Sequence, residues 1–232
     1  MNKGCDGVED QARPKALIVY YSFSHQTERV ADAIADELSR RGVDVTKTPI
    51  AFTDKRWAAR FETVPMRFPM IKIVGMLPAQ LRHATGEIQT PPAAATDGYD
   101  LVVVGSPTWW FRVSIPMRSW LTSPAAKVVL SGTPFAAFTT SRRYWRQNIG
   151  DIRKLGEASG GRFIDQTHFV AEGNQVTSMI SWLVYMAGIH ALEGKFGLPP
   201  PNLKPDFEAQ ARTYAAAVAD QTLRQAGSST AG

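Results

Sequence analysis

A short polar stretch beginning at Ser22 combines side chains that suit the binding of an anion. Three hydroxyls and one amide occur within six residues, in the order Ser22-Phe23-Ser24-His25-Gln26-Thr27. The stretch follows the apolar run 16–21, which has strand length, and precedes the amphipathic segment 28–41, which has helical spacing. A helix N-terminus, with unpaired N–H groups and the positive end of its dipole, would therefore lie here. We predict a phosphate-binding loop, with helix capping by a single serine as the alternative.

Aromatic side chains follow the clearest strand in the sequence. Residues 99–105 form an apolar, β-branched run, and Ser106-Pro107-Thr108-Trp109-Trp110-Phe111 comes directly after it. In open α/β sheets, ligands bind beyond the carboxyl ends of the strands, near the topological switch point. This rule places the tryptophan pair beside residues 22–27. We expect one tryptophan of the pair to fill the core, and the sequence does not choose between them.

The remaining predicted elements alternate between strand and helix. This alternation indicates an α/β protein with a parallel sheet, because parallel neighbours need helical crossover connections. Segments with helical spacing follow most of the strands, and the chain closes on one more such segment. The further predicted strands are 43–50, 128–138 and 162–170, and the further predicted helices are 146–158 and 206–226.

Two of these stretches resemble the flavin-binding loops of the flavodoxin superfamily. Tyr-Tyr-Ser-x-Ser-x-x-Thr, ending at Thr27, resembles the loop that holds the FMN phosphate. Tyr-Asp-Leu-Val-Val-Val-Gly-Ser-Pro-Thr-Trp-Trp, ending at Trp110, resembles the loop that faces the isoalloxazine ring. The resemblance implies a flavodoxin-like, doubly wound, five-stranded parallel sheet of order 2-1-3-4-5. It also implies a single domain over residues 15–226, with a helical insertion after the second strand at about 51–97.

The resemblance further implies a third cofactor loop at residues 139–145. Arg142 or Arg143 could stabilise a reduced flavin or bind the phosphate of a nicotinamide cofactor, or both could be solvated arginines. No metal site is expected. The residues predicted to contact FMN are Ser22, Ser24, His25, Gln26, Thr27, Pro107, Thr108, Trp109, Trp110, Phe111, Thr139, Thr140, Ser141, Arg142 and Tyr144.

Two positions depart from the pattern of the superfamily. His25-Gln26 stands where relatives often have Gly-Asn, and Phe111-Arg112 stands where many have glycine after the aromatic pair. Side chains therefore replace glycines near the cofactor. This change could tighten the site, alter its ligand, or remove flavin binding.

Two apolar stretches are candidates for contact surfaces. Residues 51–97 mix apolar and basic side chains with prolines, so we expect short helices packed over the sheet. They could form a lid, a pocket wall, a dimer contact or a membrane contact, or could simply cover a sheet edge. Residues 175–192 carry no formal charge but are short for a bilayer, which favours a buried or interface helix. We expect a homodimer, and we regard peripheral membrane contact as a further possibility.

Composition excludes several other classes of protein. The net charge is +5, yet the basic residues are dispersed and no nucleic-acid-binding signature accompanies them. The single cysteine, Cys5, cannot form an internal disulfide. Residues 1–14 lack the apolar core of a signal peptide, so we expect a cytoplasmic protein. Residues 1–14 and 227–232 are expected to be flexible tails.

The leading functional hypothesis is an FMN-dependent oxidoreductase that resembles quinone reductases. It would take hydride from NAD(P)H and pass electrons to a quinone or another small acceptor. Since the flavin supplies the chemistry, no catalytic acid or base is nominated. A flavodoxin-type electron carrier ranks lower, because those carriers are usually acidic and compact. A third possibility is a module without redox activity that binds a phosphorylated ligand or a protein partner in the same crevice.

Overall fold

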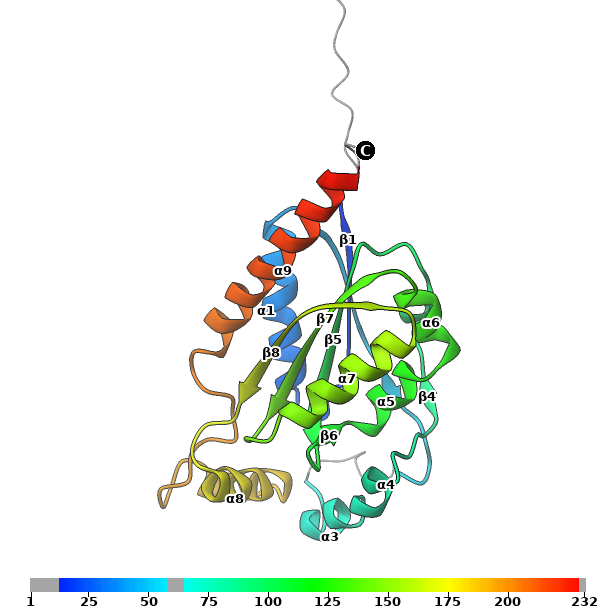
Figure 1. The fold of residues 1–232 in the computed structure, drawn as a ribbon. Helices are drawn as coiled ribbons and strands as arrows, with labels where there is room; N and C mark the ends of the chain where they lie inside the picture. Colours follow the sequence, from blue (N-terminus) through cyan, green and yellow to red (C-terminus); the bar gives the residue numbers. More distant parts are fainter. Residues whose placement is uncertain (1–12, 58–64, 230–232) are drawn as a thin grey trace, which may run out of the picture.

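The fold is taken from a computed structural model that describes residues 13–57 and 65–229 (Figure 1). Its central sheet pairs five strands in parallel in the order β2-β1-β5-β7-β8. These strands are β1 (Lys15–Tyr20), β2 (Asp44–Pro49), β5 (Leu101–Trp109), β7 (Pro134–Ser141) and β8 (Arg162–Val170). Counted along the chain, the order is 2-1-3-4-5, which is the flavodoxin-like doubly wound order. The predicted fold class is therefore confirmed.

Helices cover both faces of the sheet (Figure 1). One face carries α1 (Gln26–Arg40) and α9 (Phe207–Ser229), and the other carries α5 (Ile115–Leu121), α6 (Pro124–Leu130) and α7 (Arg146–Ala158). Successive strand residues alternate between the two cores, because side chains on a strand point to opposite faces. Ile18 packs with α1 and α9, whereas Leu17 and Val19 pack with α5, α6 and α7. This double burial explains why the central strands are continuous apolar runs.

Two predicted boundaries differ from the structure. Val128-Val129-Leu130, predicted to belong to a strand, forms the end of α6. The Ser123 hydroxyl caps this helix by accepting from the Ala126 N–H at 3.3 Å. Val129 and Leu130 are buried while Val128 is exposed, which is the spacing of a helix rather than of a strand. At the other end of the chain, α9 continues to Ser229, so residues 227–229 are helical and not tail.

The segment after β2 contains the short helices that its prolines predict. They are α3 (Pro69–Val74), α4 (Leu77–Leu81) and the 3₁₀ turn η1 (Pro92–Ala95). A small antiparallel pair, β3 (Ala51–Phe52) and β4 (Ile88–Gln89), was not predicted. Residues 58–64 of the predicted insertion lie outside the described residues, as do residues 1–12 of the predicted N-terminal tail.

Asp54 holds the two ends of this insertion together. Its buried carboxylate accepts from the Arg56 guanidinium and, at 3.1 Å, from the Glu87 N–H. The hydrogen bond from Arg56 is the main reason why the pKa of Asp54 falls to about 2. A depressed pKa means that the stability contributed by this carboxylate is present above its ordinary pKa of 3.8. That contribution is lost as the pH falls toward about 2.

Beyond the main sheet, α8 (Gln175–Met186) and the short turn η2 (His190–Leu192) occupy the region predicted as one apolar helix. Within the part of the chain that the structure describes, no helix is long and apolar enough to cross a bilayer.

A pair of glycines in α7 allows a test of the packing against β7. A Cβ at Gly156 would lie 2.4 Å from the Phe135 ring, whereas a Cβ at Gly150 would meet nothing within 4 Å. We expect Gly156→Ala to lower the free energy of unfolding by about 1–3 kcal/mol, because the buried ring must move. Gly150→Ala should raise it by roughly 0.5–1 kcal/mol through helix propensity. Urea denaturation of both variants measures the difference, and similar stabilities would contradict the close packing of α7 on Phe135.

Candidate functional site

The three predicted loops meet at the carboxyl edge of the sheet. They follow the adjacent parallel strands β1, β5 and β7, so their starting points share one edge. The Thr27 and Thr140 hydroxyl oxygens are 2.8 Å apart, which joins the first loop to the third. Thr108 and Thr139 bring their hydroxyl oxygens within 3.1 Å, which joins the second loop to the third. Pro107 also lies opposite Thr140 in the sheet register.

The first loop ends at the N-terminus of α1. His25 is the N-cap residue, and the Arg29 N–H donates to its carbonyl at 3.0 Å. The Glu28 N–H donates to the Ser22 hydroxyl at 3.3 Å. The N–H groups of Gln26 and Thr27, in the first turn of the helix, have no intrahelical acceptors. Among the described residues, the half-buried Ser24 hydroxyl has no hydrogen-bond partner. This loop can therefore donate several hydrogen bonds to one anion.

The backbone of His25 has a conformation that glycine would adopt without strain. Its φ is 58°, in the left-handed region that costs a non-glycine residue roughly 1–2 kcal/mol. Its exposed ring nitrogen Nδ1 lies 2.8 Å from the Glu28 carboxylate, which also accepts from the Tyr20 hydroxyl at 3.3 Å. The hydrogen bond with His25 is the main cause of a lowered pKa at Glu28. The histidine thus places a polar side chain, which glycine lacks, at the rim of the first loop.

The second loop is the tight turn of a hairpin between β5 and β6 (Arg112–Val113). Trp109 pairs with Arg112, so only Trp110 and Phe111 form the turn. Both have positive φ, 48° and 69°, in a two-residue hairpin turn that usually contains Asn-Gly. Phe111, where the sequence departs from the glycine of the superfamily, therefore has a left-handed backbone conformation although it is not glycine. Such strain is commonly found at functional sites.

The aromatic side chains of the second loop have separate contacts. Trp109 meets the Tyr21 ring edge-on at 5.5 Å and packs against the core, so it is the tryptophan of the pair that fills space. The Trp110 indole N–H donates to the Ile73 carbonyl in α3 at 2.9 Å. The Phe111 ring lies 5.0 Å from the Tyr144 ring of the third loop, and both rings are about half exposed. An exposed aromatic pair therefore connects the second and third loops.

A buried polar network lies beneath these loops. The Asn148 amide in α7 donates to the Thr139 hydroxyl at 2.5 Å and to the Thr108 hydroxyl at 2.9 Å. Among the described residues, the buried Asn148 Oδ1 and Ser141 Oγ have no hydrogen-bond partner. Buried polar atoms normally have hydrogen-bond partners, so the unpaired Ser141 hydroxyl is available for a hydrogen bond to a ligand. Asn148 was not predicted, although a polar residue on the buried face of an amphipathic helix is a usable signal.

The two arginines of the third loop have different surroundings. Arg142 lies over the Trp182 ring at 5.3 Å and donates to the Ser178 carbonyl in α8. Burial lowers its pKa to about 10, so it remains a cation at neutral pH. Arg143 is exposed and, with Arg142 and Lys204, lines a hollow of about 260 Å³. Two residues before Lys204, the Asn202 side chain accepts from the Gln26 amide of the first loop at 3.3 Å.

The insertion supports the second loop from outside the sheet. The Gln80 amide in α4 donates to the Trp109 carbonyl at 3.0 Å. The buried Arg118 guanidinium in α5 donates to the Gln80 side-chain oxygen at 2.6 Å and to the Ala84 carbonyl at 3.0 Å. Burial lowers the pKa of Arg118. Neither residue was predicted, yet both fix the hairpin that carries the tryptophan pair.

Known proteins resemble parts of this chain. No family model matches it. Two relatives named NAD(P)H dehydrogenase (quinone), from Cupriavidus metallidurans and Acidovorax ebreus, are each 30% identical over 134 residues, or 55% of this chain. The match covers 56% of each relative, so the chain spans little more than half of their length. A solved flavoprotein in complex with FMN from Lactobacillus acidophilus has a TM-score of 0.49 and 20% identity, over 67% of this chain and 93% of that one.

Proposed function

We propose that this protein is an FMN-binding oxidoreductase that transfers electrons from NAD(P)H to a quinone or another small acceptor. The observation that carries the proposal is the meeting of three hydroxyl-rich and aromatic loops at the carboxyl edge of a flavodoxin-like sheet. In sheets of this order, that edge is where ligands bind. The name shared by the two relatives supports the choice of hydride donor and acceptor.

The residues at this edge fit the chemistry of FMN. The N–H groups of Gln26 and Thr27 and the Ser24 hydroxyl would hold the phosphate, because a helix N-terminus favours a dianion. The buried Ser141 hydroxyl, which has no partner among the described residues, offers a further hydrogen bond to the ligand. Phe111 and Tyr144 supply exposed ring surface for a flat heterocycle.

When bound, FMN supplies the chemistry of hydride acceptance and electron donation. The chain then has to bind the cofactor, orient it and leave one face open to donor and acceptor in turn. The cation of Arg142, fixed between Trp182 and Ser178, favours negative charge at the third loop. Arg143 and Lys204 line the hollow next to it, which suits the phosphates of a nicotinamide cofactor.

The test of this proposal is a steady-state assay of the purified protein loaded with FMN. We expect oxidation of NADPH or NADH that depends on both FMN and an added quinone. Protein without FMN and free FMN at the same concentration serve as controls. FMN binding without donor oxidation would favour an electron carrier, and no FMN binding would favour the module without redox activity. Either result would overturn the proposal.

A further inference from the structure

The first two turns of helix α8 have the reverse of the usual amphipathic arrangement. There Ser178 and Ser181 are buried, each 2% exposed, while Val176 is 65% exposed and Met179 and Ile180 are also exposed; nearer the end of the helix, Met186 is buried. A surface helix normally buries its apolar stripe and exposes its polar face. Since the first turns of α8 do the opposite, their outer face is suited to an apolar partner rather than to water.

Helix α3 continues the same apolar surface. None of its residues is buried, and Phe68, Met70, Ile71 and Val74 are exposed, with Ile71 at 70%. The α3 and α8 helices are in contact and lie together beyond the carboxyl ends of the strands (Figure 1). We call this surface the apolar face, and it consists of Phe68, Met70, Ile71, Val74, Val176, Met179 and Ile180.

The charged residues within the two segments that carry the apolar face are of one sign. Residues 65–86 contain Arg67, Lys72 and Arg82 but no aspartate or glutamate. Residues 173–192 contain no charged residue of either sign, counting histidine as neutral. Arg67 is exposed, and its guanidinium lies 5.2 Å from the centre of the exposed Phe68 ring. An apolar surface with a cationic margin is therefore available at this end of the molecule.

The charge pattern distinguishes between two occupants. A second copy related by two-fold symmetry would bring the same patch of both subunits into one interface, so the cations Arg67 and Lys72 of both subunits would gather there without a carboxylate from residues 65–86 or 173–192. Like charges in such a contact are unfavourable. An anionic lipid surface would instead pair with these cations and receive the apolar side chains at the boundary between headgroups and acyl chains.

We propose that the apolar face docks on an anionic lipid bilayer, with Phe68, Ile71 and Val176 inserted at its surface. The chain then rests on the membrane without spanning it. A corollary, which rests on the proposed function, is that an acceptor dissolved in the lipid would lie near the three loops, because both are at the same end of the sheet (Figure 1). Lipid docking itself requires no redox activity.

Vesicle sedimentation of the full-length protein tests this proposal without any flavin or hydride donor. The probes are vesicles of phosphatidylcholine with phosphatidylglycerol and vesicles of phosphatidylcholine alone. We expect binding to the anionic vesicles that weakens with added salt. Ile71→Asp and Lys72→Glu should each weaken it by about tenfold or more, since the first removes an inserted apolar side chain and both introduce a negative charge that the anionic surface repels.

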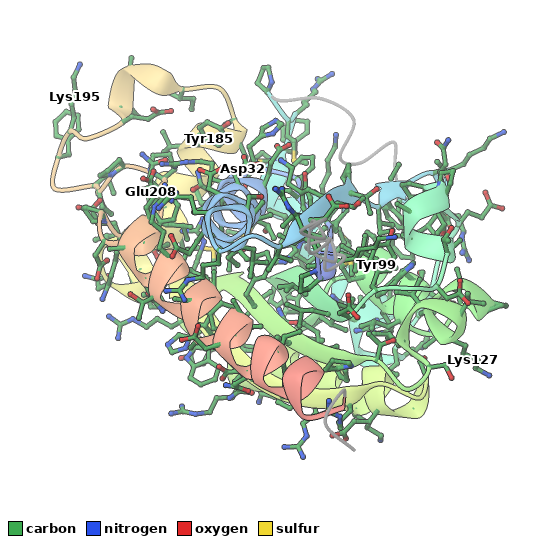
Figure 2. All side chains as sticks on the ribbon, turned by 90° about the horizontal axis from the view of Figure 1, so that it is seen from above. Asp32, Tyr99, Lys127, Tyr185, Lys195 and Glu208 are labelled. Carbon is green, nitrogen blue, oxygen red and sulfur yellow. The ribbon has the colours of Figure 1, made fainter. Side chains whose placement is uncertain are left out.

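Two matched controls come from α6, away from the apolar face. Val128 is exposed like the apolar-face residues, and Lys127 precedes it. Figure 2 shows Lys127 far from Tyr185 of α8. Val128→Asp and Lys127→Glu should bind vesicles like the wild type, whereas equal losses in all four variants would overturn the proposal, because net charge alone would then explain the binding. Wild-type protein that stays in the supernatant would overturn the proposal, as would a dimer in light scattering that Ile71→Asp dissociates.

Discussion

Titration of the wild-type protein with FMN should quench tryptophan fluorescence to saturation, and the Thr27→Val variant should bind FMN roughly 10- to 100-fold more weakly. Thr27 is buried, and its hydroxyl lies 2.8 Å from that of Thr140. If Thr140 donates this hydrogen bond, the Thr27 proton is free for the phosphate. A hydrogen bond to a charged group contributes about 1.5–3 kcal/mol, which corresponds to the expected loss of affinity.

Valine has nearly the same shape as threonine, so the variant removes a hydroxyl without leaving a cavity. The matched control is Thr222→Val in α9, where a buried hydroxyl donates to the Val218 carbonyl far from the loops in sequence. This control should bind FMN like the wild type. Equal affinities for all three proteins would show that Thr27 does not contact the ligand. No quenching in the wild type would show that His25 and Phe111 mark a site adapted to another ligand.

The fold and the meeting of the three loops at one edge of the sheet were predictable because they depend on local patterns. The central strands are buried on both faces, so they appear in the sequence as continuous apolar runs such as 16–21. A hydroxyl-rich stretch after one run, and a tryptophan pair after another, then lie at the same sheet edge because parallel strands end together. Only the strand order required the resemblance to a known superfamily.

Other features depend on partners that are distant in sequence. Val128-Val129-Leu130 favours a strand by composition, but Ser123 and Pro124 begin a helix before it, and tertiary packing determines its conformation. Three residues hold the loops through hydrogen bonds that span 29 to 40 residues of sequence, apart from the bond of Asn148 to Thr139. They are Asn148, Gln80 and Arg118. Periodicity alone does not indicate such pairs.

The inverted polarity of α8 illustrates the same limit. Its composition correctly predicted a helix, and its role as a buried or interface helix stays a prediction. Composition does not show which face is turned inward, because that depends on what the helix packs against. The structure buries Ser178 and Ser181 and turns Ile180 outward, so apolar side chains of the first turns face away from the protein, whereas Met186 near the end of the helix is buried.

The second prediction concerns the strained turn of the second loop. Phe111→Gly should lower kcat/KM for NAD(P)H and quinone by about tenfold while changing the free energy of unfolding by less than about 1 kcal/mol. Phe111 has φ 69°, so glycine relieves roughly 1–2 kcal/mol of left-handed strain. The variant also loses the ring contact with Tyr144, worth about 0.5–1.5 kcal/mol, and gains chain entropy in the unfolded state. These changes in stability nearly cancel.

The expected loss of activity is not offset by the relief of strain, because the half-exposed Phe111 ring is one of the surfaces that would hold the flavin and exclude water. Phe111→Ala separates the effect of the aromatic ring from the effect of the backbone strain, because it loses the ring but keeps the left-handed conformation. It should therefore match Phe111→Gly in activity and fall about 1 kcal/mol below it in stability. His83→Gly is the control for strain alone, since His83 has φ 51° at the end of α4 and should leave kcat/KM unchanged. Full activity in Phe111→Gly would mean that the left-handed turn only shapes the hairpin and that the ring lies outside the site.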